Sequence, residues 1–334
     1  MQGRGRGVVL PPIGIAYDGD VGRRIDAVLG IAMLNGFAAK GEARRITLTV
    51  STPSLKTAQI ADVVASFYTP PAAAARGGVG AAREGMIGMP EGPTGKDDPL
   101  LATLLAKYQS AIAGVADTPE SAVLIRNLLL AQNDQNAAIV SAGPATNLAR
   151  LAGLYRAIPQ LVAKVKHAVV ALGAFGTTAP ADPSITQDLA SARKLFAEWP
   201  TPLVAVGTEV GAALPFPGAS VDRDFAWATT PHPVVDAYRA FKPMPYDAPA
   251  GALAALLYAV HPADGYFKTS DAGTISVGDD GRTTFTPSAE GKHRYLIVDP
   301  AQSDKILKLY TELVASKPIP RPTRGRGGAP EADA

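Results

Sequence analysis

Short apolar runs alternate with amphipathic stretches along most of the 334-residue sequence, and this alternation limits the fold more than any other feature. We expect buried strands at residues 13–17, 46–50, 138–141, 168–172 and 203–206. We expect helices between them, at about residues 23–35, 55–68, 99–115, 119–130, 147–152 and 188–197. Strands that alternate with helices are typical of parallel sheets, because a parallel crossover needs a connection long enough to hold a helix. The sequence therefore predicts an α/β fold with an open, mostly parallel sheet flanked by helices.

The last third of the sequence has a different pattern. Short strands are expected at residues 274–277, 283–286 and 295–298, and Asp279-Asp280-Gly281 between the first two is typical of a hairpin turn. A closing helix is expected at about residues 302–315. We therefore predict a small antiparallel subregion near the C-terminus, at about residues 270–299, within one large domain.

Both ends of the chain are rich in Gly and Arg, and the C-terminal end is also rich in Pro. One interpretation is an arm that binds nucleic acid, but the arginines are few and no aromatic residues lie between them, which favours solvated tails. We expect a flexible N-terminal arm at residues 1–11, a folded domain at 12–316 and a disordered tail at 317–334. Residues 70–97, which carry several Pro and Gly, are expected to form a long loop.

Composition excludes several classes of site and partner. The 32 Lys and Arg nearly balance the 30 Asp and Glu, so no overall field favours nucleic acid. The absence of Cys excludes disulfides, a thiolate nucleophile and Cys-ligated metals. The longest apolar stretch, at about residues 248–260, is too short for the roughly 20 residues of a membrane span. The compartment stays open: the cytoplasm if Met1 is the native start, and the periplasm or exterior if the chain is a processed form.

Three aspartates follow the first expected strand. Asp18 and Asp20 are two residues apart, so an extended backbone directs both to the same side, and Asp26 lies in the first turns of the next helix. Ligands of open parallel sheets bind beyond the carboxyl ends of the strands. Ordinary turn and capping roles are the alternative, but three acids around a glycine turn after a buried strand favour a functional cluster.

These residues belong to a segment that resembles the signature of the inosine-uridine-preferring nucleoside hydrolase family. Residues 15–27, Ile-Ala-Tyr-Asp-Gly-Asp-Val-Gly-Arg-Arg-Ile-Asp-Ala, are similar to a motif that opens with Asp-x-Asp and closes with Asp-Asp, although this segment closes with Asp-Ala. Further similarities follow in the order of the family, at residues 141–149, 172–176 and 181–188. A bacterial branch of the family is similar at residues 199–204, 244–247, 257–260 and 293–299. The resemblance covers about residues 12–316 and implies the nucleoside hydrolase fold.

The resemblance also implies an activity, the hydrolysis of the N-glycosidic bond of ribonucleosides. In this reaction a Ca²⁺ ion holds the ribose diol and a water molecule. By position, Asp20 is implied as the base that takes a proton from this water. Asp18, Asp20 and the backbone carbonyl of Thr146 are implied as metal ligands.

Three further positions are implied to contact the sugar. Asp26 is implied as the acceptor for a ribose hydroxyl, and Asp182 and Ser184 stand where the family has a sugar-binding Glu and Asn. The implied partner is a small-molecule riboside or sugar, without nucleic acid or membrane. Whether the chain forms a homo-oligomer stays open.

The sequence departs from the family where the metal should bind. Ala27 stands at the second Asp of the closing pair, and Ala252 at a late metal-binding Asp. A bound cation acidifies its water, and each pKa unit of this shift corresponds to about 1.4 kcal/mol. The loss of two anionic ligands should weaken Ca²⁺ binding and thereby remove this effect. The two alanines therefore predict loss of Ca²⁺ affinity and of turnover. The expected cofactor is Ca²⁺ if the family site survives, and otherwise none. Two functions stay open: an N-ribosyl hydrolase that is impaired or uses altered metal ligation, and a non-catalytic relative that binds a riboside or sugar or serves as a scaffold.

Two arginines, Arg23 and Arg24, stand at the start of the helix that carries Asp26. A helix N-terminus disfavours cations by roughly 0.3–1 kcal/mol, so neighbouring acids should account for their presence. We hypothesise that at least one guanidinium points into the cluster of Asp18, Asp20 and Asp26 and replaces the charge of the cation. The alternative is that both side chains point to solvent.

Overall fold

The computed structural model describes residues 11–68, 86–92, 99–154, 157–176 and 180–319. In this part of the chain ten strands form one sheet, in the order β3-β2-β1-β4-β5-β6-β10-β8-β9, with β7 paired to β10. The strands are β1 (Ile13–Gly19), β2 (Ala43–Val50), β3 (Ile87–Gly88), β4 (Ala137–Ala142), β5 (Val165–Val170), β6 (Leu203–Ala205), β7 (Phe267–Thr269), β8 (Gly273–Val277), β9 (Thr283–Pro287) and β10 (His293–Val298). All pairings from β3 to β10 through β6 are parallel, which confirms the expected mostly parallel sheet.

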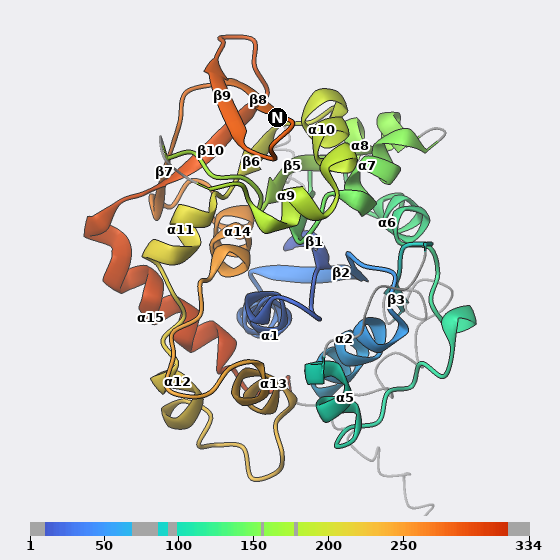
Figure 1. Ribbon diagram of the computed structural model, residues 1–334, viewed down its shortest axis with the longest axis vertical. Helices are drawn as coiled ribbons and strands as arrows, with labels where there is room; N and C mark the ends of the chain where they lie inside the picture. Colours follow the sequence, from blue (N-terminus) through green and yellow to red (C-terminus); the bar gives the residue numbers. More distant parts are fainter. Residues whose placement is uncertain (1–10, 69–85, 93–98, 155–156, 177–179, 320–334) are drawn as a thin grey trace, which may run out of the picture.

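Helices flank this sheet, as Figure 1 shows. They are α1 (Ile25–Lys40), α2 (Leu55–Tyr68), α5 (Pro99–Leu105), α6 (Ser121–Leu129), α7 (Thr146–Gly153), α8 (Ala157–Lys164), α9 (Pro183–Gln187), α10 (Leu189–Glu198), α11 (Thr208–Ala213), α12 (Ala219–Arg223), α13 (Pro233–Phe241), α14 (Gly251–Val260) and α15 (Ser303–Val314). Two short 3₁₀ turns are η1 (Val115–Asp117) and η2 (Pro300–Gln302). Among the described helices, none combines the length and apolar character that a membrane crossing needs.

The central strands are buried on both faces, which explains why they read as continuous apolar runs. Along β4, Ala138 and Val140 belong to one apolar cluster, and Ala137 and Ile139 to another. Successive side chains of a strand point to opposite faces, so these two clusters are the cores on the two sides of the sheet. The first core holds α1 and α14, and the second holds α7 and α10.

The C-terminal subregion is antiparallel, as expected. Strand β8 pairs antiparallel with β9 and with β10, and β7 pairs antiparallel with β10. Strand β10 also pairs parallel with β6, so the subregion extends the main sheet.

One predicted element is wrong in extent. The helix expected at residues 99–115 ends at Leu105. The following chain is held instead by Asp62 of α2, whose carboxylate accepts hydrogen bonds from the hydroxyl of Ser110 and the backbone N–H of Ala111. These bonds from a residue far away in the sequence hold residues 110 and 111 outside helix α5. Most of the expected loop at 70–97 lies outside the described residues, as do the arm and the tail apart from residue 11 and residues 317–319.

Candidate functional site

Asp18, near the end of β1, is completely buried between the two neighbouring strands. One oxygen accepts hydrogen bonds from Thr49 Oγ1 and Asn147 Nδ2, both at 2.7 Å. The other accepts from Ser51 Oγ at 2.9 Å and Ser141 Oγ at 3.3 Å. Burial raises the pKa of Asp18, while these four donors lower it, and the net direction is upward. Both oxygens are therefore saturated by donors from β2, β4, α7 and the chain after β2, so the carboxylate ties these segments together.

Asp20 follows β1 and differs from Asp18 in having an unused acceptor. Only 2% of Asp20 is exposed, and its Oδ1 is buried without a hydrogen-bond partner. Burial raises the pKa of Asp20 to about 6, against the lowering effect of Arg23 and Arg24. The backbone carbonyl of Asp20 accepts hydrogen bonds from the backbone N–H groups of Arg23 and Arg24, at 3.1 and 2.9 Å. A tight turn therefore links Asp20 to the two arginines.

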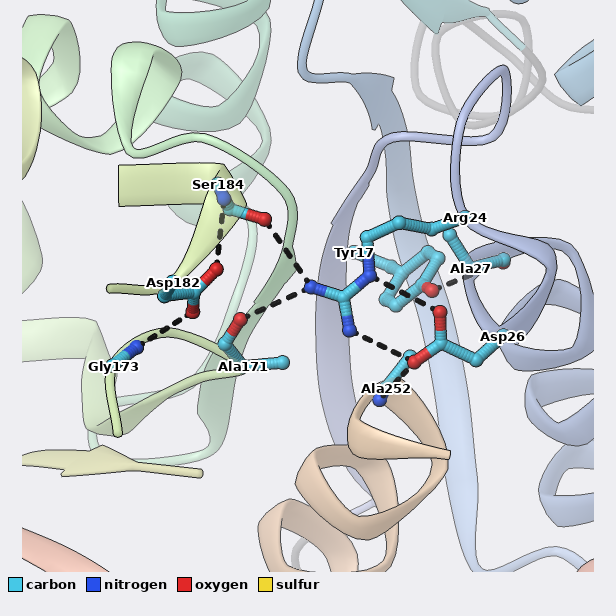
Figure 2. A network of polar contacts seen from close by, with 9 residues as sticks. All are labelled: Tyr17, Arg24, Asp26, Ala27, Ala171, Gly173, Asp182, Ser184 and Ala252. Carbon is cyan, nitrogen blue, oxygen red and sulfur yellow. Dashed lines mark hydrogen bonds and ion pairs between the residues drawn. The ribbon is translucent and has the colours of Figure 1, made fainter. Parts of the chain in front are cut away.

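Arg24 reaches across the site. Figure 2 shows its guanidinium between two walls, one with Asp26 and the other with Ala171 and Ser184. On one side its Nε and Nη2 donate to the two carboxylate oxygens of Asp26, at 3.1 and 2.9 Å. On the other side its Nη1 donates to the carbonyl of Ala171 at 3.2 Å, with the hydroxyl of Ser184 at 3.5 Å. The N–H of Ala252, in the first turn of α14, also donates to Asp26 at 2.9 Å. The guanidinium thus joins α1, the residue after β5 and α9.

This bridge is mostly buried. The side chain of Arg24 is 23% exposed and that of Asp26 is 5% exposed. Burial lowers the pKa of Arg24, but the carboxylate of Asp26 raises it, and the net direction is upward. The guanidinium therefore stays charged, in a two-point geometry that is among the stronger ionic contacts in proteins.

Asp182 caps helix α9 on the wall opposite Asp26. Its carboxylate accepts from the backbone N–H of Ser184 at 2.7 Å and from that of Gly173 at 2.8 Å. Only 4% of Asp182 is exposed, and burial raises its pKa while Arg24 lowers it. The motif Asp-Pro-Ser at the start of α9 explains this local geometry, because Asp is a favoured N-cap and Pro fits the first turn.

A cavity of about 370 Å³ lies against this network. Its polar lining includes Arg24, Asp26, Asp182 and Ser184, and Phe241 at the end of α13 belongs to its apolar lining. This volume is within the range of small-molecule sites, which are apolar pockets with a few convergent polar groups. Asp18 and Asp20 are not among the lining residues.

The donor set does not fit a calcium ion. Calcium takes 6–8 oxygen ligands, which in proteins are carboxylates, carbonyl groups and waters. Both oxygens of Asp18 are taken by four donors, and those of Asp26 by Arg24 and the N–H of Ala252. Of the three aspartates, only Asp20 presents an oxygen without a partner. Within the described ranges, no group of three or more His, Cys, Asp or Glu is arranged to hold a metal.

The remaining positions named from the sequence lie as follows. Thr146 opens α7, and its hydroxyl donates to Asp188 at 2.5 Å. Arg23 is exposed and lines the cavity, whereas Ala27 is buried in α1, where its carbonyl accepts a hydrogen bond from the hydroxyl of Tyr17.

The structure therefore brings four of the predicted site residues together in the cavity lining: Arg24, Asp26, Asp182 and Ser184. Asp18 and Asp20 are not part of this lining.

Sequence reasoning missed three parts of the site. The carbonyl of Ala171 carries no side-chain signal, and Phe241 ends a helix that we did not expect. Gly251 is the third: a Cβ on it would lie 3.2 Å from Nη2 of Arg24, which is closer than most such contacts. A glycine at the first position of an apolar helix is the one available signal, since it allows another group to approach the backbone closely.

No family model matches the sequence, and no curated protein matches it. Solved structures do match. A purine-preferring ribonucleoside hydrolase from Gardnerella vaginalis is 17% identical, with a TM-score of 0.68 over 90% of this chain and 98% of that chain. A plant nucleoside hydrolase is 18% identical, with a TM-score of 0.66 over 92% and 100%. An inosine-uridine-preferring nucleoside hydrolase from Bacillus anthracis is 13% identical, with a TM-score of 0.60 over 91% and 99%. The chain therefore shares the nucleoside hydrolase-like α/β fold over nearly its whole length.

Proposed function

We propose that this chain binds a ribonucleoside or a related sugar in the cavity beside Arg24, and that it lacks calcium-assisted hydrolysis of the N-glycosidic bond. The observation that carries the proposal is the fork between Arg24 and Asp26 in the lining of that cavity. The fold supports the ligand class, since the similar solved structures are described as nucleoside hydrolases. The saturated carboxylates support the loss of the metal-dependent step.

The polar lining suits a ligand with several hydroxyl groups. A carboxylate offers about four acceptor positions, and Asp182 uses two of them for backbone N–H groups. Its remaining capacity, with the hydroxyl of Ser184, can receive and return hydrogen bonds to a sugar. Asp26 already accepts three hydrogen bonds, so it has little capacity left for a ligand hydroxyl. These capacities favour Asp182 and Ser184, rather than Asp26, as the groups that contact a sugar hydroxyl.

We further propose that the chain is a relative of the inosine-uridine-preferring nucleoside hydrolases of the bacterial branch, with a degenerate metal site. The motifs in order along the sequence and the shared fold support this placement. The replacement of carboxylates by Ala27 and Ala252 supports the degenerate site.

A second candidate is slow hydrolysis of ribonucleosides without calcium, with Asp20 as the base. The buried, unpartnered Oδ1 of Asp20 and its pKa of about 6 favour this candidate, because a base acts best when its pKa lies near the working pH. Asp20 lies outside the cavity lining, so this reaction needs a water molecule between Asp20 and the ligand.

The first test separates binding from turnover. The purified protein, stripped with a chelator, is incubated with inosine, uridine or ribose, with and without Ca²⁺, and both thermal stability and release of free base are followed. We expect a riboside-dependent rise in Tm with no dependence on Ca²⁺. Base release that Ca²⁺ stimulates would contradict the proposal, and slow release without Ca²⁺ that Asp20→Asn abolishes would favour the second candidate.

A matched pair of variants locates the ligand. Ser184→Ala removes a hydroxyl from the cavity lining, whereas Ser276→Ala removes an exposed hydroxyl in β8 that is not part of that lining. We expect Ser184→Ala to reduce riboside affinity several-fold, since a typical hydrogen bond contributes about 1 kcal/mol, and Ser276→Ala to leave it unchanged. Equal affinities in both variants would place the ligand elsewhere.

A further inference from the structure

We infer that Arg24 is a built-in cation that occupies an oxygen-lined seat, and that removal of its guanidinium turns this seat into a site for a hard divalent cation. Four oxygens surround the guanidinium: both carboxylate oxygens of Asp26, the carbonyl of Ala171 and the hydroxyl of Ser184. Carboxylate, carbonyl and hydroxyl oxygens are also the ligands that Ca²⁺ takes, with water completing its shell. This inference concerns the charge balance of the site and does not depend on the riboside proposal.

We call these four oxygens, from Asp26, Ala171 and Ser184, the seat. The position of Arg24 indicates that contacts with the seat, and not with the helix terminus, hold the guanidinium. Arg24 is the residue before α1, with an extended backbone, and its side chain makes no capping hydrogen bond. The N-terminus of a helix disfavours a positive charge at this place. The adjacent Arg23 is exposed, whereas the side chain of Arg24 is largely buried between two walls (Figure 2).

Gly251 leaves the room that the seat requires. A Cβ on Gly251 would meet Nη2 of Arg24 at 3.2 Å and the Cβ of Ala171 at 3.6 Å. The next residue, Ala252, donates its backbone N–H to the same carboxylate oxygen of Asp26 that Nη2 contacts. The start of α14 therefore supports the fork through its backbone and its lack of a side chain.

A guanidinium and a divalent cation cannot share these oxygens, because both carboxylate oxygens of Asp26 already accept from Arg24. The tethered cation never dissociates, so the site of the native protein should be insensitive to chelators. Without Arg24, the carboxylate of Asp26 is left buried and unpaired, which is costly until a cation neutralises it. The two cations are therefore alternatives for one seat.

The experiment compares the native chain with Arg24→Ala and Arg24→Lys. Tm is measured in CaCl₂, in guanidinium chloride and in NaCl of equal ionic strength, with Ca²⁺ at about ten times the roughly 1 mM dissociation constant of weak calcium sites. We expect the native Tm to be the same in all three salts. Arg24→Ala should melt several degrees lower and regain part of the loss in Ca²⁺ or guanidinium but not in NaCl. The Tm of Arg24→Lys should lie between those of the native chain and Arg24→Ala, since an ammonium keeps the charge but cannot form the two-point contact with Asp26.

The control is Arg193→Ala, because Arg193 pairs with an Asp279 side chain that is fully exposed. This variant should lose little stability and show no rescue by either cation. A native protein stabilised specifically by Ca²⁺ would overturn the inference. So would an Arg24→Ala variant that is as stable as the native chain, or one that neither cation rescues.

If Arg24→Ala does not fold, a double-mutant cycle keeps the inference testable. Arg24→Gln leaves Asp26 charged without a cation, and Arg24→Gln with Asp26→Asn removes both charges in nearly the same shape. We expect the double variant to be more stable than Arg24→Gln alone. A double variant that is less stable would show that Asp26 does not need a cation. No riboside enters these measurements, so their failure is distinct from failure of the proposed function.

Discussion

Three aspartates within nine residues have three different environments, and chemistry at the residue scale decides which of them is available. Asp18 is saturated by four side-chain donors, Asp26 is held by Arg24 and a backbone N–H, and Asp20 keeps an oxygen without a partner. Residue type alone does not distinguish them. The donors around each carboxylate do, and they come from distant parts of the chain.

The buried carboxylate of Asp20, whose Oδ1 has no partner, predicts a pH-dependent stability. Its pKa is raised to about 6 in the folded state, so the folded state binds the proton more tightly than the unfolded chain. The charged form is therefore destabilising above pH 6, and this cost is relieved as the pH falls through about 6. We expect Asp20→Asn to raise stability at pH 8 by on the order of 2 kcal/mol, and by much less near pH 4.

Urea unfolding at the two pH values measures this difference. The control is Asp279→Asn, a fully exposed aspartate whose replacement should change stability little at either pH. If Asp20→Asn destabilises the protein at pH 8, the charged carboxylate of Asp20 is stabilised by its surroundings, which would contradict this prediction.

His232 predicts the opposite pH dependence. Only 3% of the residue is exposed, and both ring nitrogens are buried without a partner. The rings of four aromatic residues pack around it: Phe67, Tyr68, Phe225 and Trp227. Burial lowers the pKa of His232 to about 4, so the folded state disfavours its protonated form. Stability from the neutral ring is complete above about pH 6.5 and is lost as the pH falls toward 4.

His232→Phe should therefore lose less stability than the native chain between pH 6.5 and 4.5. Protonation of Asp20 stabilises the folded state over much of the same pH range, so the stability profile of the native chain does not separate the two groups. The informative quantity is the difference in the free energy of unfolding between the native chain and His232→Phe at each pH. Parallel profiles for the native chain and His232→Phe would contradict the buried, neutral histidine.

At the scale of elements, helix α1 carries the site and is enclosed on nearly all sides. Residues 25–37 of α1 are all buried, and α1 packs against α2, α14, α15 and β2. A helix that is apolar all round belongs in a core, and its N-terminus is thereby fixed near the carboxyl end of β1. The geometry of Arg24 and Asp26 rests on this rigid element rather than on a loop.

The contact between α1 and α15 yields a test of that rigidity. A Cβ on Gly36 would lie 2.4 Å from the backbone carbonyl oxygen of Leu313. Alanine is favoured over glycine inside a helix by about 1 kcal/mol, but overpacking against backbone costs about 1–3 kcal/mol. We expect Gly36→Ala to destabilise the protein in thermal unfolding. Gly114→Ala, where nothing lies within 4 Å of the added Cβ, should not; equal effects would refute the close contact.

At the scale of the whole molecule, the fold could be predicted well from the sequence and the site only in part. Buried parallel strands produce continuous apolar runs, so β1, β2, β4, β5 and β6 were all expected close to where they lie. The two-residue strand β3 is too short to produce a pattern. The helix from Pro99 was expected to be longer because periodicity does not show that Asp62 captures the chain after it.

The site was limited by the same lack of long-range information. The sequence placed Arg24 beside three acids, but Ala171 and Ser184 lie about 150 residues away, and only the strand order brings them near. A backbone carbonyl has no signature in a sequence. The saturation of Asp18 was hidden for the same reason, since its donors follow from the register of β1 with β2 and β4.

Calcium binding by the unaltered protein is the decisive measurement, because we propose that Arg24 and the saturated carboxylates of Asp18 and Asp26 leave no site for this ion at the end of β1. Isothermal titration of CaCl₂ into metal-free protein should show no stoichiometric site, with only weak binding at millimolar concentrations. Binding of one Ca²⁺ per chain with a micromolar dissociation constant would show that these carboxylates hold the ion despite Arg24.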